Sequence, residues 1–332
     1  MSTKVTIKTI AADLGVSHMT VSRALSSHAN VRPELREKIL KRAEELGYVR
    51  NAAALAMRGD TLPSIGLLIP NLRNEFYAHF ADALTSICNE QSINLLIHLT
   101  HDDIAKEEHA LTLLKEAQAQ TVIMVPSPAP VHYTSTHTSG LNIIQFIRTH
   151  PRIDQPSNLL IDDAPAILEA LQHLSQSGHS KIAYIGADKS LASGQQRYDN
   201  FLKAAQACQI DITTSPILTG PPTRDYGYNS VRHILETSPQ TTALICGGFD
   251  ISVGATNALL KDTGSLPAHF GFVGYGDPSF YQWIGNGISA IALPMESLAR
   301  KAIEHLMTYK MEKHFTPLVF TQTAEFIRRN SC

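Results

Sequence analysis

From residue 64 onward, short apolar runs alternate with longer amphipathic stretches, and this alternation constrains the fold more than any other feature of the chain. Strands buried on both faces form such continuous apolar runs, and parallel strands need a helical crossover between them. The sequence therefore predicts parallel sheets covered by helices. We expect strands in the runs at 64–70, 93–100, 121–127, 142–147, 158–162, 181–187, 242–248 and 270–276, and helices over 75–90, 103–118, 164–177, 193–208, 224–237, 250–262 and 296–308.

The length of this alternating region, about 270 residues, suits two α/β lobes better than one. The hydrophobic fraction of the whole chain, 43%, is ordinary for a globular protein with a core. No run of about 18 apolar residues occurs, and the N-terminus has no apolar leader before a small-residue cleavage site. We therefore expect a soluble, cytoplasmic protein.

The four cysteines, Cys88, Cys208, Cys246 and Cys332, are scattered without the spacing of a zinc site. We expect reduced structural thiols. The pair His98 and His101 fits a strand end that runs into a loop better than a metal site. The sequence thus predicts neither a metal nor a cofactor.

Charge divides the chain unevenly. Residues 1–60 contain ten Lys and Arg against six Asp and Glu, a net charge of +4, and the remainder contains 18 basic and 24 acidic residues, a net charge of −6. A basic head on an acidic body indicates a polyanionic partner for the head alone.

The head reads as three short helices. In "VTIKTIAADLGVSHMTVSRAL" (5–25), apolar residues recur at helical spacing, Gly15 ends the first helix and Ser17 is placed to cap a second. A third helix begins at Pro33 and stops at Gly47. Two helices joined by a glycine turn are typical of a helix-turn-helix, whose second helix enters the major groove of DNA. A three-helix cap with a basic surface is the alternative.

The segment "RNAAALAMRG" (50–59) lies where a linker is expected, yet it consists of strong helix formers. Asn51 can cap a helix there and Gly59 can end it. Such a helix of about two turns is too short to be stable alone.

These motifs, followed by "SIGLLIPNLRNEFY" (64–77), resemble the start of a LacI-type bacterial transcription regulator in order and spacing across some 75 residues. The resemblance implies that His18, Met19 and Arg23 read bases. It also implies phosphate contacts from hydroxyl-bearing residues near the helix starts, namely Thr6, Ser17, Thr20 and Ser22. Arg32 departs from the Ser or Thr usual before the proline, which removes a side-chain acceptor from the start of the third helix.

The resemblance also gives the segment at 50–59 a role. In such regulators this segment folds into a hinge helix when two copies meet over the DNA minor groove, and an apolar side chain wedges into a base step. The implied hinge residues are Asn51, Met57 and Arg58, and Met57 stands where the family usually has Leu.

The fold class that follows is an N-terminal all-α helix-turn-helix domain plus an α/β periplasmic-binding-protein type I core of two Rossmann-like lobes. We expect the DNA-binding domain at 1–49, the hinge and linker at 50–63, and the effector-binding and dimerisation domain at 64–332. Within the core, the first lobe is expected at about 64–161 and 292–320 and the second at about 162–291 and 321–332.

Effector residues are implied at the strand ends that face the cleft between the lobes. Phe76 and Tyr77 are aromatic rings suited to stacking, Arg197 suits vicinal hydroxyls or a carboxylate, and Ser193 lies one helical turn before it. "CGGFDISVGA" and "GYGDPSF" depart from the family pattern, which leaves Asp250 and Asp277 as displaced hydroxyl-binding acids. "SHMTVSRAL" together with "GYGDPSF" favours the gluconate-operon-repressor branch, whose effector is a sugar acid; a purine or a neutral sugar would use many of the same positions.

The sequence therefore predicts a homodimeric, effector-responsive regulator that binds a near-palindromic operator in double-stranded DNA. The chain ends without leucine heptads, so we expect no tetramer-forming tail. A sugar-binding receptor is opposed by the basic head, and an enzyme by the lack of a P-loop, a GxSxG elbow or a GxGxxG that opens a helix.

Overall fold

The computed structural model describes residues 5–25, 31–48, 63–128, 136–151, 153–261, 264–267, 269–312 and 316–332, without the side chains of 309–312. The chain divides into two compact units, Met1–Leu62 and Pro63–Cys332. The expected hinge residues Asn51, Met57 and Arg58 lie outside the described residues, so their roles stay predictions.

The described residues of the first unit form three helices, α1 (Ile7–Leu14), α2 (His18–Leu25) and α3 (Pro33–Glu45), as the sequence predicts. Gly15 ends α1 in the left-handed conformation at φ 63°, which a residue without Cβ adopts at little cost. Ile10, Val21 and Ile39, one from each helix, are fully buried and form the centre of a small core. Each helix is too short to be stable by itself, so this shared core holds the head together.

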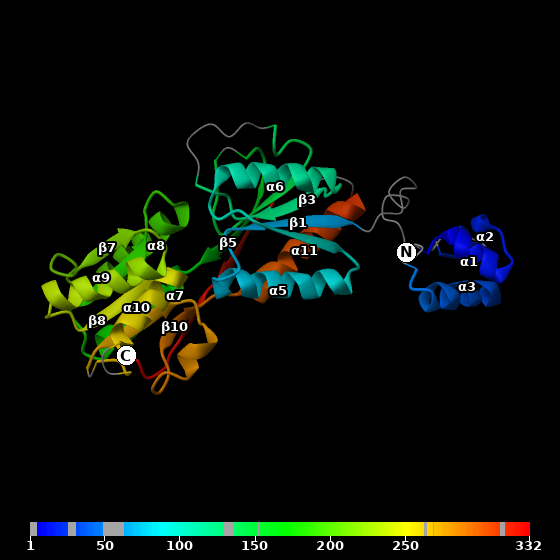
Figure 1. Ribbon diagram of the computed structural model, residues 1–332. Helices are drawn as coiled ribbons and strands as arrows, with labels where there is room; N and C mark the ends of the chain where they lie inside the picture. The colour runs from blue at the N-terminus through cyan, green and yellow to red at the C-terminus, as the bar shows by residue number, and fades with distance from the viewer. Residues whose placement is uncertain are drawn as a thin grey trace. The chain divides into compact units, whose positions relative to one another are not determined.

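The first lobe of the second unit is a six-stranded parallel sheet in the order β11-β5-β4-β3-β1-β2 (Figure 1). Figure 1 shows α6 on one side of this sheet and α5 and α11 on the other. The strands are β1 (Ser64–Ile69), β2 (Asn94–Leu99), β3 (Thr121–Met124), β4 (Asn142–Phe146), β5 (Ser157–Asp162) and β11 (Val319–Thr323); the helices are α5 (Glu75–Glu90), α6 (Ile104–Glu116) and α11 (Met295–Glu312).

The second lobe is another six-stranded sheet, in the order β12-β10-β9-β8-β6-β7, parallel except for β12, which runs antiparallel to β10. Its strands are β6 (Ile182–Ala187), β7 (Ile217–Gly220), β8 (Ala243–Gly247), β9 (Gly271–Tyr275), β10 (Ser289–Ala292) and β12 (Glu325–Ile327). Its helices are α7 (Ala164–Gln176), α8 (Ala192–Ala207), α9 (Arg224–Thr237) and α10 (Phe249–Leu260), with a 3₁₀ turn at Ser279–Gln282. Among the helices described here, none is both long and apolar enough to cross a membrane.

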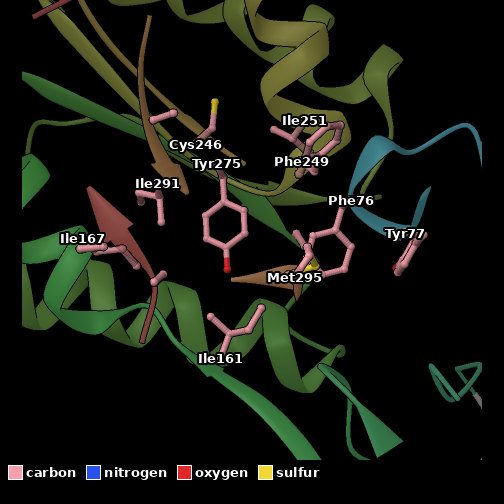
Figure 2. Packing of buried hydrophobic residues seen from close by; sticks show 14 of the residues in the cluster. Phe76, Tyr77, Ile161, Ile167, Cys246, Phe249, Ile251, Tyr275, Ile291 and Met295 are labelled. Carbon is pink, nitrogen blue, oxygen red and sulfur yellow. The ribbon is translucent and has the colours of Figure 1, made fainter. Parts of the chain in front are cut away.

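The chain passes between the lobes three times, after β5, after β10 and after β11. Two of these crossovers touch, because the Ala324 amide donates to the carbonyl oxygen of Asp162 at 2.9 Å. Buried side chains of both lobes, among them Ile161, Phe249, Tyr275 and Met295, belong to one hydrophobic cluster (Figure 2). The two lobes therefore share a continuous core.

Each of the eight expected strands and seven expected helices of this region is present, with ends that differ from the expected ones by up to four residues. The sequence analysis missed β7, β10 and β11. The run "SAIA" in β10 has only one large side chain, and the residues of β11 are alternately exposed and half-buried, so neither shows the continuous run of large apolar residues that predicts a buried strand. The expected boundary at 320 is wrong, because β11 continues in the first sheet to Thr323 and the crossover lies at Ala324.

Close approach of α9 and α10 depends on two glycines. A Cβ on Gly254 would lie 1.9 Å from the carbonyl oxygen of Arg224, and a Cβ on Gly227 would lie 2.1 Å from that of Ile251. This contact sets the first turns of the two helices side by side. Arg224 and Asp250, one in each first turn, are thereby brought within 2.9 Å of each other.

We predict that Gly254→Ala lowers the free energy of unfolding by about 2 kcal/mol, because the new methyl group meets backbone atoms that cannot rotate away. The gain in helix propensity, about 1 kcal/mol, is smaller than this penalty. Urea unfolding of the full chain measures the difference.

The matched control is Asn257→Ala, on the exposed face of the same helix, which should be neutral or slightly stabilising. A Gly254→Ala protein as stable as the native one would show that α9 can move away from α10 at no cost.

Candidate functional site

The first candidate site is the outer face of α2. His18, Met19 and Arg23 are all exposed, and Met19 keeps 54% of its surface, whereas Val21, Ala24 and Leu25 are buried against the other two helices. A single exposed apolar residue is ordinary on a protein surface, so it is the exposed basic side chains beside Met19 that suit this face to a polyanionic partner. The structure thus places the three predicted base-reading residues together on the exposed side of one helix.

The predicted phosphate-contacting residues lie at the two helix starts. The Thr6 hydroxyl accepts from the Thr9 amide at 3.3 Å, and the Ser17 hydroxyl accepts from the Thr20 amide at 3.0 Å. Both are therefore helix caps, so the amides and hydroxyls of each first turn are held in fixed positions at the surface. Ser22 is half-buried on α2. Arg32 makes no side-chain cap for α3, as its departure from Ser or Thr predicts.

The second candidate site is a pocket between the two lobes of the core. It lies at the carboxyl ends of the parallel strands, where ligands bind in α/β sheets. Five of the six predicted effector residues line it: Phe76, Tyr77, Ser193, Arg197 and Asp250. Phe76 and Tyr77 meet edge to face, with ring centroids 5.1 Å apart.

Asp277 does not line this pocket. Both of its carboxylate oxygens accept from Arg329, each at 2.7 Å, so that the pair fixes the C-terminal segment to the second lobe. The sequence placed Asp277 in the pocket because it follows Gly276, which stands at the family's ligand-binding position. Gly276 is left-handed at φ 86°, however, and the chain turns away from the pocket before Asp277. We therefore leave Asp277 out of the effector site.

Arg197 is held rigidly in the second lobe. Its Nε donates to Asp163 at 3.2 Å, its Nη1 donates to the carbonyl oxygen of Gly247 at 3.3 Å, and its guanidinium lies over the ring of Tyr275 at 4.1 Å. Asp163 is 2% exposed and also accepts from the Tyr275 hydroxyl at 2.7 Å and from Asn200 at 2.8 Å. Such a buried carboxylate with three donors fixes the arginine in one orientation.

Asp250 links the two lobes. One oxygen accepts from Nδ2 of Asn74 in the first lobe at 3.0 Å, and the other accepts from Nε of Arg224 in the second lobe at 2.9 Å. Arg224 in turn donates to the carbonyl oxygen of Arg73 in the first lobe at 3.2 Å. A predicted hydroxyl-binding acid therefore also joins the lobes across the mouth of the cleft.

The sequence analysis missed the charged residues that the first lobe contributes. Arg148 is 8% exposed and donates from Nη1 to Asp102 at 2.6 Å, and both residues line the pocket. Burial raises the pKa of the Tyr77 phenol. The positive charges of Arg148 and Arg197 lower this pKa, and the negative charges of Asp102 and Asp250 raise it. All four charges therefore act on one ring in the pocket.

A clue to these missed residues was present in the sequence. Asp102, Arg148 and Asp163 each follow closely after a predicted strand, and the ends of parallel strands form the binding edge of such a sheet.

A buried carboxyl lies behind Arg148. Glu107 of α6 is fully buried, one oxygen accepts from the Ser127 amide at 2.5 Å, and Oε1 has no partner among the described residues. Burial raises the pKa of Glu107 to about 7, against the opposing effects of the Ser127 bonds and of the positive charge of Arg148.

Fold and pocket together define a helix-turn-helix regulator with a periplasmic-binding-protein-like core. Residues 6–51 match the bacterial regulatory proteins of the lacI family, and residues 62–308 match the periplasmic binding proteins and sugar binding domain of the LacI family. Since these matches cover most of the chain, it belongs to the LacI family.

Relatives agree with this assignment over nearly the whole length. The chain is 26% identical over 330 residues to the probable HTH-type transcriptional repressor ExuR of Bacillus subtilis (strain 168), with 98% of each chain covered. It is 24% identical over 306 residues to catabolite control protein A of Priestia megaterium, with 92% of each covered. The fold is similar to that of the lac repressor dimer bound to operator and an anti-inducer, with a TM-score of 0.82 and 17% identity over 99% of each chain.

We predict that Asp163→Asn lowers the free energy of unfolding by about 3 kcal/mol, because it leaves the Arg197 guanidinium in the pocket wall without its compensating charge. Chemical unfolding of the full chain measures this loss. Asp82→Asn, an exposed change of the same kind on α5, should stay within about 0.5 kcal/mol of the native protein. Equal stabilities for the two variants would contradict the role given to Asp163.

A second prediction concerns pH. Because the pKa of folded Glu107 lies near 7 and above the ordinary 4.5, its contribution to stability is fully present below about pH 4.5 and is lost as the pH rises through about 7. Glu107→Gln removes this titration. Above pH 7 the variant should therefore exceed the native protein in unfolding free energy by on the order of 2–3 kcal/mol.

Unfolding curves collected from pH 4.5 to 8 test this expectation, with Glu116→Gln on the exposed face of the same helix as the control. If the Glu107→Gln and native curves run parallel across that range, Glu107 is ionised throughout and the prediction is wrong.

Proposed function

We propose that this protein is a cytoplasmic, homodimeric transcriptional repressor whose DNA affinity responds to a small polar effector, and that it controls genes for uptake and catabolism of a carbohydrate or sugar acid. The single observation that carries the proposal is the exposed face of α2, with its two basic residues and Met19, in a chain of the LacI family that also has a charged cleft pocket.

On DNA, α2 lies in the major groove and presents His18, Met19 and Arg23 to base edges. Arg23 is suited to guanine because its guanidinium donates to O6 and N7 together. Thr6, Ser17, Thr20 and Ser22 position the head by phosphate contacts, which carry no sequence information themselves. Two heads of a dimer then read the halves of a near-palindromic operator, with Asn51, Met57 and Arg58 over the minor groove at its centre.

The effector binds in the cleft pocket of the core. Phe76 and Tyr77 offer aromatic surface, Arg197 and Ser193 offer donors, and Asp250 offers carboxylate oxygens to hydroxyl groups. A polyhydroxy acid such as gluconate matches this mixture because it presents hydroxyl donors and a carboxylate in one small molecule. The alternative is a purine, which would stack on the same rings.

Effector binding acts on the link between the lobes. A ligand hydroxyl that bonds to Asp250 competes with Asn74, and so changes how the second lobe sits on the start of α5. A ligand shifts the balance between two lobe arrangements only if it binds one of them more tightly than the other. The exchange of the Asp250–Asn74 bond for a ligand bond provides this difference in affinity. The change in lobe arrangement then alters the spacing of the two hinge segments.

We predict that Arg23→Ala lowers affinity for the selected operator by about 1–3 kcal/mol and reduces discrimination against other sequences, because a bidentate base contact is lost. The operator is first selected from a random DNA library with the native protein. Gel shifts with operator and scrambled duplexes at two salt concentrations then give both affinities.

Lys41→Ala removes the same charge from an exposed position on α3 and should leave the ratio of specific to nonspecific affinity unchanged. Failure of the native protein to select any sequence would overturn the proposed function. Retention of the full ratio by Arg23→Ala would overturn the base-reading role of that residue.

A further inference from the structure

Arg148 enters the pocket from a strained turn. The Arg148 amide donates to the carbonyl oxygen of Phe146 at 2.6 Å, which closes a turn of three residues around Ile147 at φ 56°. A β-branched residue in the left-handed region is in a rare, unfavourable conformation that persists only where the surrounding fold enforces it. The strand end of β4 is thus bent so that Arg148 lies in the pocket wall.

Its partner is placed by the same kind of strain. His101 and Asp102, which follow β2, are consecutive left-handed residues at φ 54° and 56°. The Asp102 side chain remains 35% exposed, whereas that of Arg148 is 9% exposed. The strained residues are thus Asp102 itself and Ile147, the residue before Arg148, and such strain is concentrated at binding sites.

The hydrogen bonds of Arg148 engage only one end of the guanidinium. Nη1 donates to Asp102 and, at 3.0 Å, to the carbonyl oxygen of Pro126. Among the described residues Nε is buried without an acceptor, and none of the hydrogen bonds there uses Nη2. Nε and Nη2 form the edge of a guanidinium that binds both oxygens of a carboxylate. On Arg148 both nitrogens lack a partner among the described residues, and the buried Nε is a donor that a carboxylate packed against this edge would satisfy.

Arg197 differs in each of these respects. Its Nε is bonded to Asp163, which is fully buried and which water therefore does not screen. Asp102, by contrast, is one-third exposed, so water weakens its field in the pocket. Of the two arginines, Arg148 keeps two nitrogens without a partner among the described residues, Nε and Nη2, and Arg197 keeps only Nη2.

We propose that Arg148 is the residue that recognises the carboxylate of an acidic effector, while Arg197 and Asp250 of the opposite lobe hold its hydroxyl groups. This assignment rests on the proposed effector-binding function of the cleft. It fixes the orientation of the ligand, with the acid end against the first lobe. It also predicts that selectivity for an acid over the matching neutral polyol depends on one side chain.

The test is isothermal titration of the full chain with two matched pairs of probes, gluconate against glucitol and glucuronate against glucose. We expect the native protein to bind the acid of at least one pair at least tenfold more tightly than the neutral member. Arg148→Gln should reduce that preference to within about threefold, because the affinity for the acid falls by more than the affinity for the neutral member. Arg197→Ala should weaken binding of both members.

Arg300→Gln, which removes one exposed arginine charge from the same lobe, is the control and should keep the native preference. If Arg148→Gln does not fold, the double variant Asp102→Asn with Arg148→Gln removes the pair as a unit and should lose the preference in the same way. If a folded variant without Arg148 still prefers the acid as strongly as the native protein does, the assignment of Arg148 is wrong, while the proposed function stands. Binding of none of the four probes by the native protein would overturn both the sugar-acid effector class and the assignment.

Discussion

The arrangement of the core depends on the buried carboxylate of Asp163. This residue lies at the first crossover, between the last strand residue of the first sheet and the first helix of the second lobe. Its oxygens accept from Arg197 and Asn200 on α8 and from Tyr275 on β9. A buried carboxylate is stable only when donors or positive charges contact it directly. The three donors are therefore held at the crossover, where they form part of the pocket wall.

Charge in the pocket is balanced pair by pair. Arg197 is matched by Asp163, Arg148 by Asp102 and Arg224 by Asp250, so the site has little net charge with which to attract an ion. The pocket must then distinguish one ligand from another by which hydrogen-bond donors and acceptors have no protein partner. The proposed ligand, which carries hydroxyl donors and a carboxylate together, would then lie with its polar ends against opposite lobes.

Much of the fold could be predicted from local patterns. Apolar runs marked most of the parallel strands, and Gly15 and Gly47 marked the helix ends of the head, because burial on two faces and helix termination both leave direct traces in residue type. The misses had weak traces. β10 has only one large apolar residue, Ile291, and β11 has exposed side chains, so neither differs clearly from a loop in composition.

The sequence by itself determined the family, the order of elements and five of the pocket residues, because each of these depends on residue type at fixed spacing along the chain. Only the tertiary structure decided how the charges pair. Arg148 meets Asp102 across 46 residues, Arg197 meets Asp163 across 34, and Asp277 binds Arg329 instead of the pocket. Such pairings depend on strand order, crossovers and left-handed turns such as that at Ile147, which bring together residues far apart in the chain and which no local spacing encodes.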